Sequence, residues 1–275
     1  MIKKENNFLY RSRYALSVLV KSKTLMPFFA WLNFWITSEP VKRVRIGECS
    51  FYVRGNSLAN KLIDIYVILE NSVDQAYSKG FTPKKDATII DIGGHIGAFS
   101  VNAGTQITDG IIYAFEPFAE NFNFLKKNIE LNKLNNVVPI NCAVASSNGD
   151  KVLYLDNLNS SGHSLTKASG NPVKVTSTTL ADFFKEKNIE RCNFLKMDCE
   201  GSEYDIILNT PEETLKKIDY MIFEYHMPSF FGLGDDSLYD RLLEKLKKCG
   251  FAVTAEKENY QRGYIRASQL GLTKQ

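Results

Sequence analysis

The sequence predicts an α/β fold, a doubly wound and mostly parallel sheet with helices on both faces. From residue 87 onward, short continuous apolar runs alternate with segments of helical periodicity, which is typical of strands buried on both faces. Only a short polar turn separates the last two apolar runs, so those two strands must pair antiparallel. With 275 residues, 44% of them hydrophobic, the chain is long enough for one large domain and an extension.

The N-terminal part has a different pattern. Residues 1–37 are predicted to be helical, and Ser38 to Pro40 end that segment. Residues 41–54 alternate between polar and apolar around a turn at Gly47, which predicts a β-hairpin. A further helix is predicted over 59–78. We therefore expect a helical and hairpin extension over residues 1–58 and a main domain over 59–275.

Seven apolar runs in the main domain are predicted to form one sheet. They cover residues 88–92, 111–115, 137–144, 193–198, 220–225, 251–254 and 263–267. Helices are expected between most of them, for example over 97–106 and after a cap at Thr178 or Thr179. Two additional strands, 151–155 and 173–176, flank a polar insertion at 157–171.

Charge and cysteine content restrict the surroundings of the protein. Residues 1–45 hold nine Lys or Arg and two acids, a net +7, whereas the remainder has 25 basic and 29 acidic residues, a net −4. The overall +3 does not indicate a nucleic-acid partner. The basic N-terminus is either a solvated helical face or a peripheral contact with a membrane or an acidic partner.

The cysteines and the first residues favour a cytoplasmic protein. None of the five cysteines forms a C-x-x-C pair, which is consistent with buried free thiols in a reducing compartment. The first 15 residues are too polar for a secretory signal. The apolar stretch 25–36 is too short to span a bilayer, so it is either buried or lies on a membrane surface.

A glycine-rich turn indicates a nucleotide-type ligand. Residues 91–97 read DIGGHIG and follow the first strand of the predicted sheet, and residues 114–117 read AFEP at the end of the second. Ligands of such sheets bind outside the carboxyl ends of the strands. Glu116, 23 residues after Gly93, is placed where its carboxylate can accept hydrogen bonds from both ribose hydroxyls.

The spacing of the turn distinguishes between nucleotides. A dinucleotide fingerprint G-x-G-x-x-G would need glycine where Ile92 stands. Asp91 would repel a pyrophosphate but suits a cationic ligand, and S-adenosylmethionine carries a sulfonium and an ammonium group. The sequence thus favours this methyl donor over NAD, with an NAD-dependent oxidoreductase as the alternative. A tight turn without any ligand is the remaining interpretation.

Three motifs together resemble the FkbM-type methyltransferases, class I enzymes that use S-adenosylmethionine. They are DIGGHIG at 91–97, AFEP at 114–117 and FLKMDCEGSE at 194–203, where K-x-D-x-E-G-x-E is the most specific. The resemblance covers roughly residues 60–268 and implies O-methylation of sugars, polyketides or other natural products. His95 replaces the asparagine more usual in the family.

The expected donor site combines the motifs with the end of the third strand. The glycine turn would hold the donor, Glu116 and Pro117 would lie at the ribose, and the third strand would end beside adenine. The residues assigned to the donor are Asp91, Gly93, Gly94, Gly97, Glu116, Pro117, Asn141, Ala143 and Asp198.

Two pairs of polar residues follow later strands. Asp198 and Glu200 are one residue apart, so on an extended chain both would point into the same crevice. Asp198 is expected at the donor's amino group or at the acceptor, and Glu200 at the acceptor unless it caps the next helix. Glu224 and His226 have the same spacing, and His226 is the preferred general base for a hydroxyl acceptor.

Several features of the reaction stay open. His163 in the polar insertion is the second candidate for the base and is expected to contact the acceptor. The side chains of Asp198, Glu200, Glu224 and His226 have a spacing that also permits a divalent metal. Alignment of acceptor and donor without a dedicated base is another mechanism. A non-catalytic binding protein with the same fold is the third function considered.

Overall fold

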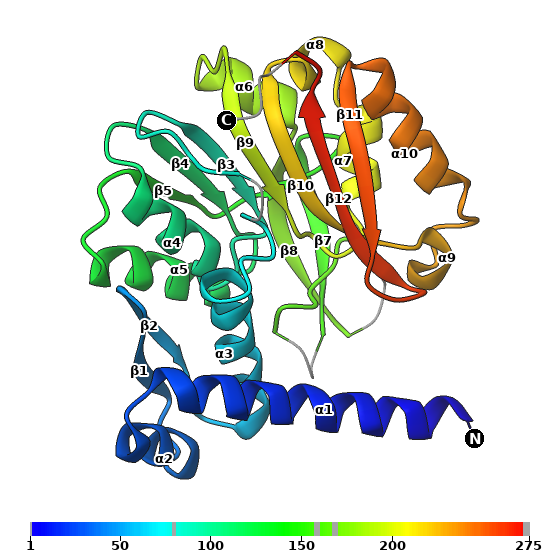
Figure 1. The fold of residues 1–275 in the computed structure, drawn as a ribbon. Helices are drawn as coiled ribbons and strands as arrows, with labels where there is room; N and C mark the ends of the chain where they lie inside the picture. Colours follow the sequence, from blue (N-terminus) through cyan, green and yellow to red (C-terminus); the bar gives the residue numbers. More distant parts are fainter. Residues whose placement is uncertain (1, 79–80, 157–159, 167–169, 272–275) are drawn as a thin grey trace.

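The computed structural model describes residues 2–78, 81–156, 160–166 and 170–271. A seven-stranded sheet forms its centre and helices cover both faces, as the sequence predicts (Figure 1). The strands in spatial order are β11 (Phe251–Lys257), β12 (Arg262–Gln269), β10 (Ile218–His226), β9 (Cys192–Met197), β3 (Thr88–Ile92), β4 (Ile111–Phe115) and β5 (Val137–Ile140). Only β12 runs antiparallel to its neighbours, β10 and β11.

Strand residues alternate between two apolar layers, which explains the continuous apolar runs. Ile89 of β3 packs into one layer and Ile90 into the other. The first layer is covered by α3 (Leu58–Ser72), α4 (Ala98–Gln106) and α5 (Ala119–Leu131). The second is covered by α6 (Leu180–Glu186), α7 (Glu203–Asn209), α8 (Glu212–Leu215) and α10 (Ser237–Lys248).

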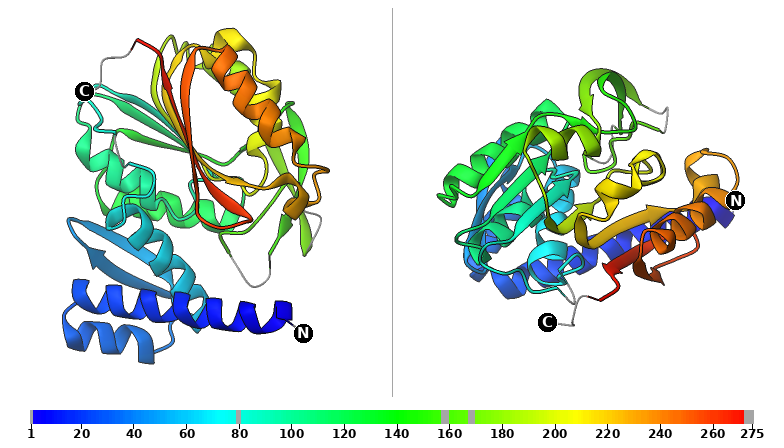
Figure 2. Two further views of the ribbon diagram at one scale, coloured as in Figure 1. Left: turned by 45° about the vertical axis from the view of Figure 1, so that its right-hand side comes forward. Right: turned by 90° about the horizontal axis from the view of Figure 1, so that it is seen from above.

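The N-terminal extension packs on the first layer. It consists of α1 (Ile2–Leu25), α2 (Phe28–Ile36) and the hairpin of β1 (Val41–Ile46) and β2 (Cys49–Arg54), close to the expected bounds. Val18, Phe34 and Phe51 are buried in the same apolar cluster as Ile89. Figure 2 shows α1 and α2 side by side, beyond the hairpin and α3. Within the described residues, no helix combines the length and the apolar character needed to cross a membrane.

Two predicted elements differ from the structure more than the others do. The helix expected over 59–78 ends at Ser72, and Gln75 adopts a left-handed conformation with φ of 50°. The strand expected over 137–144 is interrupted after Ile140, because the backbone N–H of Cys142 donates to the carbonyl of Ile140 in a tight turn.

The residues beyond that turn join another sheet. β6 (Ala143–Val144) pairs with β8 (Asn171–Thr178), which pairs with β7 (Gly149–Leu155). The predicted polar insertion connects β7 and β8 of this three-stranded sheet. Its residues 157–159 and 167–169 lie outside the described residues. The loop expected at 226–236 includes the short helix α9 (Pro228–Phe231).

Candidate active site

The glycine turn after β3 lies against the end of β9. Gly93 and Gly97 have φ of +80° and +88°, values that glycine adopts without strain. A Cβ atom on Gly93 would lie 1.9 Å from the carbonyl oxygen of Asp198, so only glycine fits. The glycine turn that the sequence predicts after β3 is therefore present, and it packs closely against the third motif.

Lys196 is the lysine of the K-x-D-x-E-G-x-E pattern within the third motif, and it contacts the glycine turn. Its ammonium donates to the Gly93 carbonyl at 2.7 Å and forms an ion pair with Asp91 at 3.1 Å. Ser100 donates a further hydrogen bond to Asp91 at 2.6 Å. Burial alone would lower the pKa of Lys196. The negative charges of Asp91 and Asp198 outweigh this effect, so the pKa of Lys196 is raised.

These contacts change the interpretation of Asp91. Its side chain is fully buried and is not among those that line the pocket. We expected Asp91 to supply a negative charge to a cationic ligand, but Lys196 already provides the compensating charge. Asp91 holds Lys196 beneath the turn, and Lys196 is a residue that sequence reasoning missed, although it opens the most specific motif.

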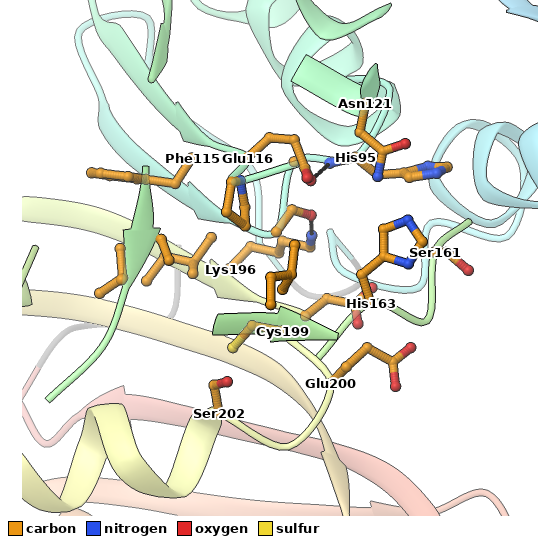
Figure 3. A pocket seen from close by; sticks show the side chains of 18 of the residues that line it. His95, Phe115, Glu116, Asn121, Ser161, His163, Lys196, Cys199, Glu200 and Ser202 are labelled. Carbon is orange, nitrogen blue, oxygen red and sulfur yellow. Dashed lines mark hydrogen bonds between the residues drawn. The ribbon is translucent and has the colours of Figure 1, made fainter. Parts of the chain in front are cut away.

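Glu116 is fixed by backbone donors on both sides. The N–H group of His95 donates to one of its carboxylate oxygens at 2.8 Å (Figure 3), and the N–H group of Phe118 donates to the other at 2.9 Å. Burial raises its pKa to about 7 despite these bonds. Asn141 donates to the carbonyls of Glu116 and Pro117, so its side chain supports this segment.

A pocket that is open to solvent lies between the glycine turn, the AFEP segment and the third motif (Figure 3). Five buried polar atoms of its lining residues have no hydrogen-bond partner among the described residues: Asn71 Oδ1, His95 Nδ1, Ser160 Oγ, His163 Nε2 and Ser202 Oγ. Because buried polar groups are normally satisfied, these atoms suit a polar ligand. The glycine turn and the carboxylate of Glu116 suit an adenosine with free ribose hydroxyls.

His163 lies in this pocket as a neutral donor. Its Nδ1 accepts a hydrogen bond from the backbone N–H of Asp156 at 3.1 Å, so Nε2 carries the proton. Burial, together with the charge of Arg54, lowers its pKa to about 4. This arrangement suits a hydrogen bond to a ligand better than proton abstraction.

Tyrosines and carboxyls gather where α3 meets the ends of β9 and β12. Tyr77 donates to Asp198 at 2.8 Å, and Tyr66 and Tyr264 both donate to Glu70 at 3.1 Å. Burial, followed by the charge of Asp198, raises the pKa of Glu70 to about 7. Sequence reasoning missed Tyr66 and Glu70 because their helix precedes the first motif and its periodicity indicates only packing.

Glu200 and His226 approach each other from different segments. Glu200 Oε2 lies 3.8 Å from His226 Nε2, and Glu200 lines the pocket. The chain there is not extended as we assumed, because β9 ends at Met197 and Glu200 has φ of 51°. The alternative role of Glu200 as a cap of the next helix stays a prediction, and Glu203 of the same motif accepts from the Cys199 N–H at 2.9 Å.

Glu224 forms an ion pair with Arg262, whose guanidinium lies 2.7 Å from the Glu224 carboxylate. Burial, followed by the charge of Asp198, raises the pKa of Glu224 well above its usual range. The described residues contain no group of three or more His, Cys, Asp or Glu that could hold a metal ion. We therefore derive no step through the metal that the spacing of these residues permitted.

A buried network connects the extension to the glycine turn. Arg54, at the end of β2, forms an ion pair with Asp64 of α3 at 2.6 Å. The same guanidinium lies 2.8 Å from His95 Nε2 and donates to Asn121 at 2.9 Å. Burial, together with Arg54, lowers the pKa of His95 well below its usual range, so the ring is neutral. His95 thus links the extension to the turn, and it also lines the pocket.

The pocket brings together part of the predicted site. The predicted residues that line it are Gly93, Gly94, Glu116, Pro117, Ala143, His163, Asp198 and Glu200. The residues that do not are Asp91, Gly97, Asn141, Glu224 and His226. Their contacts with a ligand stay predictions, and the first three support segments that line the pocket.

Comparisons with known proteins identify the family of the chain. Residues 91–253 match the methyltransferase FkbM domain. The chain is 26% identical over 241 residues to Methyltransferase 1 of Beauveria bassiana (strain ARSEF 2860), covering 80% of this chain and 93% of that protein. It is 25% identical over 226 residues to Methyltransferase sdnD of Sordaria araneosa, covering 70% and 85% of the two chains.

Among solved structures, TYW2 of M. jannaschii in complex with AdoMet matches with a TM-score of 0.41 and 15% identity. The match covers 85% of this chain and 89% of that chain. The family match spans more than half of the chain and includes the glycine turn, Glu116 and the third motif. The chain therefore belongs to the FkbM methyltransferases, which use S-adenosylmethionine.

Proposed function

We propose that this protein transfers the methyl group of S-adenosylmethionine to a hydroxyl oxygen of a sugar, a glycolipid or a similar natural product. Glu116 would hold the ribose hydroxyls of the donor, and the glycine turn would pass beneath it. Bound S-adenosylmethionine would supply an electrophilic methyl group. The protein must then place the acceptor oxygen in line with this methyl group and receive its proton.

The observation that carries the proposal is the pair of His226 and Glu200. The Glu200 carboxylate stands at the pocket wall, 3.8 Å from the imidazole of His226. A hydroxyl must lose its proton as it attacks, and histidine is suited to accept a proton near neutral pH. A carboxylate beside the ring favours the protonated imidazole that results. We therefore assign His226 as the base and Glu200 as its positioning residue.

The first experiment tests the donor. Isothermal titration should show that S-adenosylmethionine binds the wild type, and Glu116→Gln should bind it at least about tenfold more weakly, since a carboxylate is the stronger acceptor. The purified protein is then incubated with methyl-labelled donor and panels of sugars and glycolipids, and products are identified by mass spectrometry. Label found only on nitrogen or carbon would contradict the O-methyl assignment.

The second experiment tests the base. His226→Gln should reduce kcat by about 10²-fold or more while donor affinity stays near that of the wild type. Glu200→Gln should shift the pH profile of kcat, because it removes the charge beside the imidazole. His163→Gln is the matched comparison and should affect binding more than kcat. A kcat of His226→Gln equal to that of the wild type would remove His226 from the reaction.

A further inference from the structure

Helices α1 and α2 expose large apolar side chains. Phe28, Phe29 and Ile36 of α2 are 52%, 82% and 71% exposed. On α1, Leu16 and Val20 are 61% and 55% exposed, and their spacing of four residues puts them on one side of the helix. We call these five side chains the apolar face. Single exposed apolar residues are ordinary, but a set on two adjacent helices indicates an interaction surface.

The opposite side of α2 is anchored to the protein. Phe34 is buried, and the ammonium groups of Lys42 and Lys61 lie over its ring at 5.5 and 5.9 Å. Trp31 donates a hydrogen bond to Ser22 of α1 at 3.0 Å. The exposed residues of α2 thus belong to a helix with a fixed orientation.

The surroundings of the apolar face are basic. Lys23 of α1 is exposed, and so are Arg43 and Arg45 on β1, the strand that follows α2. Residues 1–45 carry nine basic and two acidic residues, whereas the rest of the chain has an excess of acids. An occupant of this face should therefore be apolar at its centre and negatively charged around it. A second copy of the chain would bring its own basic residues to the same contact, and the like charges would repel each other.

Helices α1 and α2, which carry the apolar face, lie beyond the end of the sheet at which the site is found. The parallel strands β3, β9 and β10 direct their carboxyl ends toward α3 and α1, and α1 and α2 lie beyond them (Figure 1). A surface bound by α1 and α2 would therefore lie on the same side as the pocket.

We propose that α1 and α2 bind the protein peripherally to an anionic lipid membrane. The apolar face enters the boundary between headgroups and acyl chains, and the basic residues contact the anionic headgroups. Phenylalanine and isoleucine on one side of a short helix, with basic residues nearby, are the composition expected of an interfacial helix. The proposal does not depend on which acceptor is methylated.

Tryptophan fluorescence gives a local test. The chain has two tryptophans, Trp31 and Trp35, and both belong to α2. The full-length protein is titrated with vesicles of phosphatidylcholine alone or mixed with phosphatidylglycerol. We expect a blue shift of emission and co-sedimentation with the mixed vesicles, weakened by added salt. No binding to the mixed vesicles would overturn the proposal.

Matched variants assign the binding to the face. Phe29→Glu/Ile36→Glu should bind mixed vesicles at least about tenfold more weakly, and Lys23→Glu should also weaken binding. Leu270→Glu changes an equally exposed residue far from α1 and should bind as the wild type does. Circular dichroism verifies that each variant is folded. Equal binding by the double variant and Leu270→Glu would overturn the proposal, as would a wild-type dimer that the double variant converts to monomers.

Discussion

Gly93 shows how tightly two motifs are joined at the scale of a residue. Its φ of +80° and the 1.9 Å that a Cβ atom would leave to the Asp198 carbonyl both require glycine. The neighbouring Gly94 differs, because a Cβ atom there would make ordinary contacts of 3.5 and 3.6 Å. These two adjacent glycines therefore provide a matched pair of substitutions.

We expect Gly93→Ala to lower the melting temperature by several degrees and to abolish detectable donor binding, because the turn must move away from Asp198. Gly94→Ala should leave the melting temperature within about 2 °C of the wild type. Thermal unfolding followed by circular dichroism, together with isothermal titration, measures both effects. Equal melting temperatures for the two variants would contradict the close packing.

Arg54 is the residue through which the extension acts on the donor turn. Replacing it with leucine leaves the carboxylate of Asp64 buried without its cation, which typically costs about 3–5 kcal/mol. It also removes the group 2.8 Å from His95 Nε2. We expect Arg54→Leu to destabilise the protein in urea unfolding and to weaken donor binding.

The double variant Arg54→Leu/Asp64→Leu separates these two effects. It removes both buried charges, so a large part of the stability should return. Donor affinity should stay reduced by about tenfold, because His95 still lacks its partner. If affinity returned together with stability, the role of Arg54 would be structural only.

The residues of the site differ in how far sequence could identify them. Glu116 and Asp198 follow strands within recognisable motifs, so position along the chain predicts that they line the pocket. Arg54, Tyr77 and Glu70 have no such local signal. They reach the site because distant segments pack together, and periodicity in one segment does not contain that information.

At the scale of elements, the junction of β9 and α7 contains a buried carboxyl group, that of Glu203. Burial raises the pKa of Glu203 from 4.5 to about 7. A carboxyl with a raised pKa in the folded protein favours folding most while it is protonated. Its contribution is complete below about pH 4.5 and is lost as the pH rises through about 7.

Glu203→Gln should therefore become more stable relative to the wild type as the pH rises. The difference in free energy of unfolding should grow by up to about 3 kcal/mol between pH 5 and pH 8, since each pKa unit corresponds to about 1.4 kcal/mol. Urea titrations at several pH values measure it. Glu213→Gln, at an exposed site on α8, is the control. A constant difference for Glu203→Gln would contradict a raised pKa.

Elements were predictable where their signal is local. The bounds of β3 and β4 are those expected, because a buried strand is a continuous apolar run that ends in a polar residue. The division of 137–144 into β5 and β6 was not predictable. Both halves are β-forming, and the turn between them depends on pairing with β8, which is distant in the sequence.

At the scale of the molecule, the order β5-β4-β3-β9-β10-β12-β11 places the motif-bearing ends of β3, β4 and β9 at one edge. Alternation of strands and helices predicts the layers, and the right-handed crossover rule restricts their order. Sequence reasoning assigned residues 1–58 to an extension of unknown role. It could not show that Phe51 and Val53 of this extension are fully buried in the apolar layer that contains α3.

This shared layer makes the extension necessary for folding. Removing residues 1–56 would uncover the side of α3 that packs on α1 and β2, with its apolar side chains in the shared cluster, and would leave Asp64 without Arg54. Exposure of several such side chains, at about 1.5–3 kcal/mol each, together with an unpaired buried charge, approaches the whole stability of a typical domain. We expect the fragment 57–275 to lack a cooperative thermal transition and to bind no donor in isothermal titration. A fragment that melts cooperatively and binds S-adenosylmethionine like the full chain would show instead that the extension is an independent addition.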